Sequence, residues 1–171
     1  MAGRTQPQDR LNNTLLMIIK LLNEHEIKDW FISYGTLLGI VRNNSCIDND
    51  DDVDIMIDES NFDKIVKILD ENNFQRNYGY GIGLSKNIIK TEETDIYSSI
   101  DFYFSIKNDK GDVFNKWENV IWSECYPLVE YTWKNEKLYF PKNYISNLTN
   151  RYGETWRTPQ NFNGFVNRKR I

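Results

Sequence analysis

The fold of this protein is decided by the stretch Asp52-Val53-Asp54-Ile55-Met56-Ile57-Asp58. Polar and apolar residues alternate along it, which is the pattern of a β-strand with one buried face. Successive side chains of a strand point to opposite faces, so Asp52 and Asp54 are predicted to lie side by side on one face. The apolar residues between them are expected to face the core, namely Val53, Ile55 and Ile57.

Two neighbouring carboxylates repel each other unless a cation lies between them. Mg²⁺ and Mn²⁺ are hard cations that prefer oxygen ligands. The acidic stretch therefore predicts a Mg²⁺ or Mn²⁺ site at Asp52 and Asp54, and Asp50 extends the same acidic row. A solvated acidic turn is the alternative interpretation.

A second feature lies upstream of the acidic stretch. Residues 30–34 are aromatic and apolar and predict a short strand, and residues 36–42 predict a short helix. Gly35-Thr36 lies at the junction, where a glycine lets backbone approach a ligand and a helix N-terminus offers free N–H groups. Gly35 and Thr36 are therefore predicted to seat a phosphate, with an ordinary turn and helix cap as the alternative.

A third acidic residue, Asp101, lies in the alternating stretch 99–106. A carboxylate among bulky apolar residues needs a partner or a metal ion, unless it lies at an exposed position. Together with Asp52 and Asp54, it completes a constellation that fits two-metal phosphoryl or nucleotidyl transfer.

The rest of the chain indicates a single α+β domain over residues 1–171, with a mixed sheet flanked by helices. The polar segments 1–8 and 160–171 are expected to be flexible ends. Apolar periodicity and turn residues predict helices over 11–22, 61–72 and 142–151, and strands over 74–78, 82–86, 128–133 and 137–140.

Composition narrows the chemistry further. The 171 residues carry 21 Lys and Arg against 25 Asp and Glu, and this net charge of −4 argues against a nucleic-acid binder. His25 is the only histidine and Cys46 and Cys125 the only cysteines, which argues against His-based catalysis and a zinc site. There is no apolar run long enough to span a membrane and no signal peptide is evident, so a cytoplasmic protein is expected.

Two blocks of residues carry a family resemblance. The first is Tyr34-Gly35-Thr36-Leu37-Leu38-Gly39-Ile40-Val41-Arg42, followed by Asp50-Asp51-Asp52-Val53-Asp54-Ile55. The second is Phe140-Pro141-Lys142-Asn143-Tyr144, followed by Tyr152-Gly153-Glu154-Thr155-Trp156-Arg157-Thr158-Pro159. In these blocks, and in their order over roughly residues 10–160, the chain resembles the LicD/fukutin-related phosphotransferase family of the nucleotidyltransferase superfold.

The resemblance implies transfer of a phosphorylated alcohol or sugar, such as phosphocholine or ribitol phosphate. A nucleotide-diphospho donor, with a CDP-linked one favoured, would give this group to a glycan or glycoconjugate hydroxyl and release a nucleoside monophosphate. Asp52 and Asp54 would hold Mg²⁺ or Mn²⁺, and Asp101 would complete a second metal site or take the acceptor's proton. The residues that would bind the donor phosphate are Gly35, Thr36 and Arg42.

Other residues have weaker roles in this hypothesis. Lys86 is a second phosphate candidate, Tyr34 lines the pocket or fills the core, and Trp156 with Arg157 closes over the site or anchors the last helix. Two other functions stay open. The same acidic residues would serve a nucleotidyltransferase that adds NMP to a small molecule or protein, and an inactive copy would bind nucleotide as a scaffold.

Overall fold

The centre of the structure is a six-stranded mixed sheet in which β2 (Asp52–Asp58) runs parallel to β4 (Ser99–Lys107). The computed structural model describes residues 4–159. The strand order is β1-β2-β4-β5-β6, and β3 pairs with the part of β4 that β5 does not reach. These further strands all pair antiparallel with their neighbours: β1 (Trp30–Ile32), β3 (Ile88–Lys90), β5 (Val113–Asn115) and β6 (Val120–Trp122).

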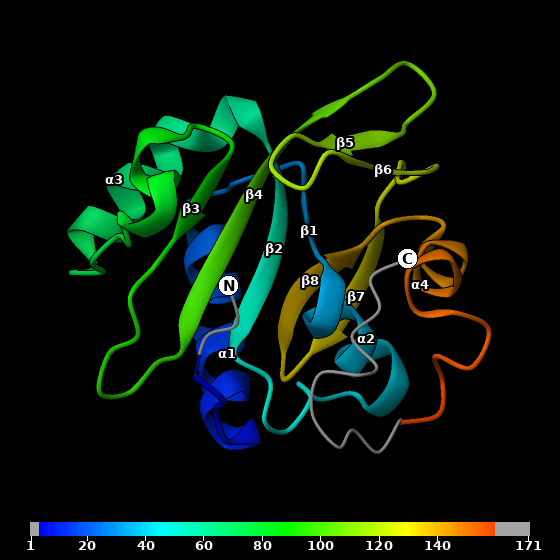
Figure 1. The fold of residues 1–171 in the computed structure, drawn as a ribbon, viewed down its shortest axis with the longest axis horizontal. Coiled ribbons are helices and arrows are strands. Elements are labelled where there is room, and N and C mark those ends of the chain that lie inside the picture. Colours follow the sequence, from blue (N-terminus) through cyan, green and yellow to red (C-terminus); the bar gives the residue numbers. More distant parts are fainter. Residues whose placement is uncertain (1–3, 160–171) are drawn as a thin grey trace.

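Helices flank the sheet, which confirms the predicted α+β fold. Figure 1 shows β2 and β4 side by side at the centre, α3 beyond β3, and α2 and α4 beyond β1. Two short 3₁₀ helices cover Glu59–Asn61 and Gly79–Leu84. The α-helices are α1 (Gln8–Glu24), α2 (Tyr34–Asn43), α3 (Phe62–Glu71) and α4 (Tyr144–Tyr152).

β2 is buried on both faces, although the alternation in its sequence predicted only one. Val53, Ile55 and Ile57 lie in the core as expected. Met56, on the opposite face, is also fully buried. Both α1 and α2 contact β2. The acidic residues of β2 therefore lie in a largely covered part of the sheet rather than on a solvated surface.

The predicted hairpin is confirmed, and it forms a separate two-stranded sheet of β7 (Val129–Trp133) and β8 (Glu136–Phe140). Its turn residues Lys134 and Asn135 both have positive φ angles, as a tight two-residue hairpin turn requires. β8 contacts α1 and β1. The Trp133 Nε1–H donates to the carbonyl of Asn44 at 2.9 Å, so the hairpin holds the C-terminal end of α2 in place.

The strands predicted over 74–78 and 82–86 are wrong. Gly81 has a φ of +76°, and the glycine-rich segment coils into the 3₁₀ helix over 79–84 instead of extending. In the first segment only Arg76 forms an isolated bridge, to Thr91. The strand that lies beside β4 is β3, which begins after this coil. β5 and β6, of three residues each, were not predicted from the sequence.

The segment predicted as the N-terminal flexible end, residues 1–8, lies partly among the described residues. There Gln6 is buried, its N–H donates to the Asp50 carbonyl at 2.8 Å, and its carbonyl accepts from the Asn49 N–H at 3.0 Å. α1 then begins at Gln8. The C-terminal prediction, 160–171, falls outside the described residues. Of the helices within 4–159, none is long and apolar enough to cross a membrane.

Candidate active site

The junction between β1 and α2 is fastened directly to the acidic strand. α2 begins at Tyr34, two residues earlier than predicted. The Ser33 N–H donates to the carbonyl of Asp54 at 3.1 Å, and the Thr36 Oγ1 accepts from the Asp54 N–H at 2.9 Å. The N-terminal turn of α2 therefore lies against the middle acidic residue of β2.

The three predicted carboxylates come together. The register pairs Asp54 of β2 with Asp101 of β4, and Asp52 lies on the same face two residues earlier. One oxygen from each of the three lies within 4.8 Å of the others. Asp54 and Asp101 are each only 6% exposed. A buried set of oxygen-only donors with three formal negative charges is the donor chemistry that a hard divalent cation prefers.

Lys90 of β3 completes this row, and the sequence analysis missed it. Its Nζ lies 2.8 Å from Asp101 Oδ1 and 3.1 Å from Asp52 Oδ2. The antiparallel register places Lys90 directly opposite Asp101, so both side chains leave the same face of the sheet. The only signal in the sequence was a lysine at the end of the apolar pair Ile88-Ile89, and its meaning depends on a strand pairing that the sequence does not show.

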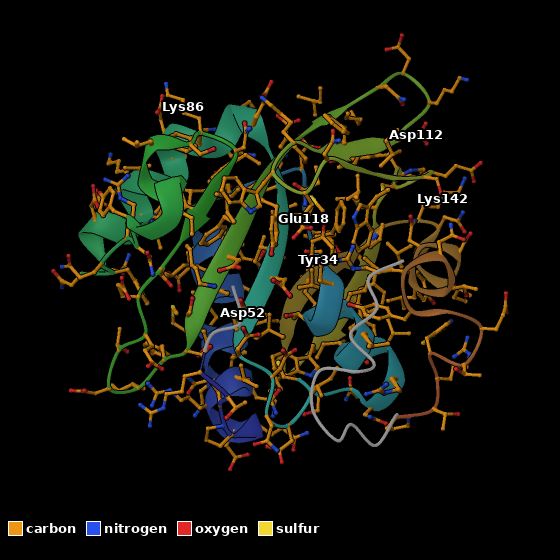
Figure 2. The ribbon with its side chains drawn as sticks, in the orientation of Figure 1. Tyr34, Asp52, Lys86, Asp112, Glu118 and Lys142 are labelled. Carbon is orange, nitrogen blue, oxygen red and sulfur yellow. The ribbon has the colours of Figure 1, made fainter. Side chains whose placement is uncertain are left out.

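The other lysine, Lys86, was the predicted phosphate candidate, and it lies elsewhere. Its Nζ is 6.0 Å from the centre of the Phe62 ring. Figure 2 shows Lys86 near α3, well away from Asp52. Its observed contact is therefore an aromatic one outside the acidic cluster.

Two tyrosines form a polar and aromatic wall beside the carboxylates. The Tyr103 hydroxyl lies 3.3 Å from Asp101 Oδ2 and 3.4 Å from Asp54 Oδ1. The Tyr34 ring meets the Tyr103 ring edge to face at 5.0 Å. The Asn115 Nδ2–H donates to the Tyr34 hydroxyl at 2.7 Å. Tyr34 is thus buried in the core and also stands next to the residue that contacts the acidic row.

A second residue that the sequence analysis missed is Arg151, at the end of α4. The carbon at the centre of its guanidinium lies 4.0 Å from the centre of the Tyr34 ring. Tyr152 beside it is also within the electrostatic reach of Asp54. Arg151 therefore presents a cation against the Tyr34 side of this wall, with Tyr103 between Tyr34 and the carboxylates.

Arg42, the predicted phosphate ligand, contacts the C-terminal segment. Its Nη1–H donates to the carbonyl of Trp156 at 3.2 Å. The Trp156 Nε1–H donates to Thr149 Oγ1 at 3.0 Å, and the Arg157 guanidinium stacks on the Trp156 ring at 4.2 Å. Of the two roles considered for Trp156 and Arg157, these contacts support anchoring of the segment after α4.

Gly35 and Asp50 lie against each other at the start of α2. A Cβ atom at Gly35 would come within 2.5 Å of Asp50 Oδ2. The Asp50 Oδ1 accepts from the Asp51 N–H at 3.0 Å. The glycine therefore leaves room for an acidic side chain at the helix N-terminus, where the sequence predicted a phosphate.

The pKa values in the cluster follow from burial and charge. Burial, and next the charges of the neighbouring carboxylates, raise the pKa of Asp52 and of Asp54 well above the usual range. Burial works against the charge of Lys90, but the two carboxylates beside it outweigh burial and raise its pKa. Burial also raises the pKa of Tyr34 to about 12. Without a metal ion, the site therefore holds more negative charge than its surroundings favour.

A pH dependence of stability follows for the metal-free protein. Because the folded-state pKa of Asp54 is raised, its contribution to stability is complete below the pKa of an unfolded Asp, about 3.9, and is lost as pH rises through the raised value. In EDTA, the difference obtained by subtracting the thermal midpoint of Asp54→Asn from that of the wild type is expected to decrease as pH rises above 4. The check is a series of thermal melts at constant ionic strength, and a difference independent of pH would contradict it.

Comparison with known proteins identifies the family of this chain. Residues 28–159 match the family described as LicD/FKTN/FKRP, nucleotidyltransferase domain. The chain is 34% identical over 144 residues to an uncharacterized protein of Rickettsia typhi, and 30% identical over 145 residues to one of Rickettsia prowazekii. Each alignment covers 79% of the chain, but only 43% and 51% of those two proteins. The chain thus spans about half the length of the curated relatives it matches.

Among solved structures, the fold is similar to that of the lincosamide antibiotic adenylyltransferase LnuA in its lincomycin-bound form. The TM-score is 0.58 with 13% sequence identity, and the match covers 82% of each chain. At this identity the likeness shows a shared nucleotidyltransferase fold. The extent of the family match decides the assignment: this chain belongs to the LicD/FKTN/FKRP family, and residues 28–159 form its nucleotidyltransferase domain.

Proposed function

We propose that this domain is a metal-dependent transferase that moves a phosphorylated alcohol or sugar from a nucleotide-diphospho donor to a glycan hydroxyl. A CDP-linked donor is favoured, and the second product is a nucleoside monophosphate. The observation that carries the proposal is the buried cluster of Asp52, Asp54 and Asp101, whose oxygens lie within 4.8 Å of one another. Its position beside the N-terminal turn of α2 supports a cation site next to an anion-binding helix N-terminus.

The three carboxylates would hold Mg²⁺ or Mn²⁺, which when bound neutralises charge on the donor pyrophosphate. Asp101 would be one of these ligands, with Lys90 beside its Oδ1 and the Tyr103 hydroxyl beside its Oδ2. The role of the protein is then to keep the oxygens fixed before the donor arrives, so that little reorganisation accompanies transfer.

At the N-terminal turn of α2 the donor phosphate would bind at Thr36, because the Asp50 carboxylate lies against Gly35. The Thr36 Oγ1 accepts from the Asp54 N–H, and its own hydroxyl proton would donate to the phosphate. Arg151, rather than Arg42, is the arginine that borders the wall of the site through its stack on Tyr34. A guanidinium there would add a charge-assisted contact to phosphate.

The hydroxyls at this turn differ in a way that allows a direct test. The Ser33 Oγ is buried and has no hydrogen-bond partner among residues 4–159. Ser33→Ala is therefore expected to leave stability unchanged or slightly higher, whereas Thr36→Val removes the acceptor of a buried N–H and costs about 1–3 kcal/mol. Urea unfolding measures both.

Donor binding separates the two hydroxyls by role. If the turn seats phosphate, both variants bind the donor more weakly, including Ser33→Ala with its intact stability. If Ser33→Ala binds the donor with wild-type affinity, the Ser33 hydroxyl does not contact the donor phosphate. Wild-type donor affinity in both variants would argue against phosphate binding at this turn.

The proposal is tested first by a thermal-shift screen of CDP-, UDP- and GDP-linked donors, each with Mg²⁺, with Mn²⁺ and with EDTA. A ligand that binds only the native state raises its stability by mass action, so a metal-dependent shift with one donor identifies the base. Product analysis then decides the reaction. Release of nucleoside monophosphate supports the proposal, and release of pyrophosphate indicates instead a nucleotidyltransferase that adds NMP to its acceptor.

A further inference from the structure

We propose that Lys90 takes the place of one of two metal ions, so that this site binds a single divalent cation. The inference rests on the metal-dependent function proposed above and specifies its stoichiometry. Its starting point is that three strands contribute to one row across the sheet, Asp54 from β2, Asp101 from β4 and Lys90 from β3. The ammonium group is thus built into the row by strand register.

The position of the Lys90 Nζ is that of a bridging cation. It lies 3.1 Å from Asp52 Oδ2 and 2.8 Å from Asp101 Oδ1, and so joins two of the three carboxylates. In a two-metal site the carboxylates serve two ions about 3.5–4 Å apart. Here one oxygen of Asp52 and one of Asp101 already face a fixed positive charge.

The oxygens that remain suit one ion. They are the second oxygen of Asp52, both oxygens of Asp54, and Asp101 Oδ2 beside the Tyr103 hydroxyl. Within the row itself the charge agrees with this number: three carboxylates and one ammonium leave two negative charges, which a single divalent cation neutralises. Asp50 and Asp51 lie outside the row and are half-buried. Since uncompensated charge in a buried site is costly, this balance favours one ion.

The side chain of Lys90 is confined between its two carboxylate partners. It is only 10% exposed, and it is flanked by partners that are 11% and 8% exposed. A second acidic group, made of Asp50, Asp51 and Asp52, lies at the rim and is half-buried. It shares Asp52 with the row, and Lys90 already engages one oxygen of that residue.

The test is a titration of the whole chain with Mn²⁺ alone, followed by electron paramagnetic resonance of free and bound Mn²⁺. The wild type is expected to bind one Mn²⁺ and to show no exchange-coupled signal from a metal pair. In Lys90→Met, which has similar length and no charge, Mn²⁺ is expected to bind at least about tenfold more tightly, because a nearby positive charge no longer opposes it. The matched control is Lys86→Met, whose lysine lies against Phe62 and whose loss is expected to leave Mn²⁺ affinity unchanged.

Each outcome of these measurements supports or contradicts the single-cation inference. Two Mn²⁺ per wild-type chain with a coupled signal would overturn the inference while leaving a metal-dependent transferase in place. Unchanged or weaker Mn²⁺ binding in Lys90→Met would also overturn it, since Lys90 would then only support the carboxylates. The absence of Mn²⁺ binding by the wild type would contradict the proposed function itself. If Lys90→Met does not fold, the wild-type stoichiometry alone still decides.

Discussion

Asp54→Asn is expected to lower turnover by roughly 10³-fold or more while leaving the fold intact. The substitution keeps the size of the side chain and removes one negative charge from the centre of the acidic row. Asp54 lies next to Asp101 in the register and is only 6% exposed, at the centre of the three carboxylates. The measurement is steady-state turnover with the donor that the metal-dependent screen identifies.

Stability measurements distinguish this loss of turnover from unfolding of the variant. Because burial and mutual repulsion raise the pKa of Asp54, replacing it with a neutral amide relieves strain in the metal-free site. Without metal, the thermal midpoint of Asp54→Asn at neutral pH is expected to equal or exceed that of the wild type, and Mn²⁺ is expected to raise it far less. Asp109→Asn, an exposed substitution in the turn before β5, is the control and should behave as wild type in both assays. Turnover retained in Asp54→Asn would contradict the metal site.

Gly39→Ala is expected to destabilise the protein by about 2–3 kcal/mol, which is the second large effect. A Cβ at Gly39 would come within 2.5 Å of the Ser45 carbonyl and 3.0 Å of the Ile47 N. These are backbone atoms of the loop that leads to the acidic strand, and backbone cannot move aside as a flexible side chain can. The gain in helix propensity, about 1 kcal/mol, is too small to compensate fully. Urea unfolding checks the size of the loss.

The same substitution four residues earlier on α2 is the matched comparison. In Gly35→Ala the new methyl group meets the Asp50 carboxylate, a side-chain end that can rotate away. Gly35→Ala is therefore expected to cost little stability but to lower turnover and Mn²⁺ affinity, because Asp50 shifts at the start of the acidic row. Equal stability loss in the two variants would show that the loop backbone is less confined at Gly39 than the structure indicates.

The sequence predicted correctly the features that depend on the residue pattern within one strand. Asp52 and Asp54 followed from the two-residue period of one strand, and Asp101 from the same period in another. These patterns alone, without the family resemblance, combine the three into one constellation, and in the structure one oxygen from each lies within 4.8 Å of the others. The mixed α+β sheet followed from the order of elements in the same way.

What the sequence could not supply was register and long-range contact. Lys90 matters only because β3 places it opposite Asp101, and the glycine-rich segment before it suggested a strand in the wrong place. Arg42 and Arg151 look alike in sequence, since each lies near the end of a helix. Only the packing of α4 beside Tyr34 brings Arg151 to the wall of the site, while Arg42 turns to the Trp156 carbonyl.

The parallel pairing of β2 with β4 has a consequence for how the domain is synthesised and assembled. Parallel neighbours require a long crossover, so Asp54 and Asp101 leave the ribosome far apart and meet only after the intervening α3 and β3 have emerged. Until then the carboxylates of β2 remain hydrated and do not repel a partner. Asp54 and Asp101 are thus brought together only when β4 pairs with β2, and Lys90 precedes β4 in the chain. Any partly folded form that lacks β4 has neither the buried repulsion nor the site.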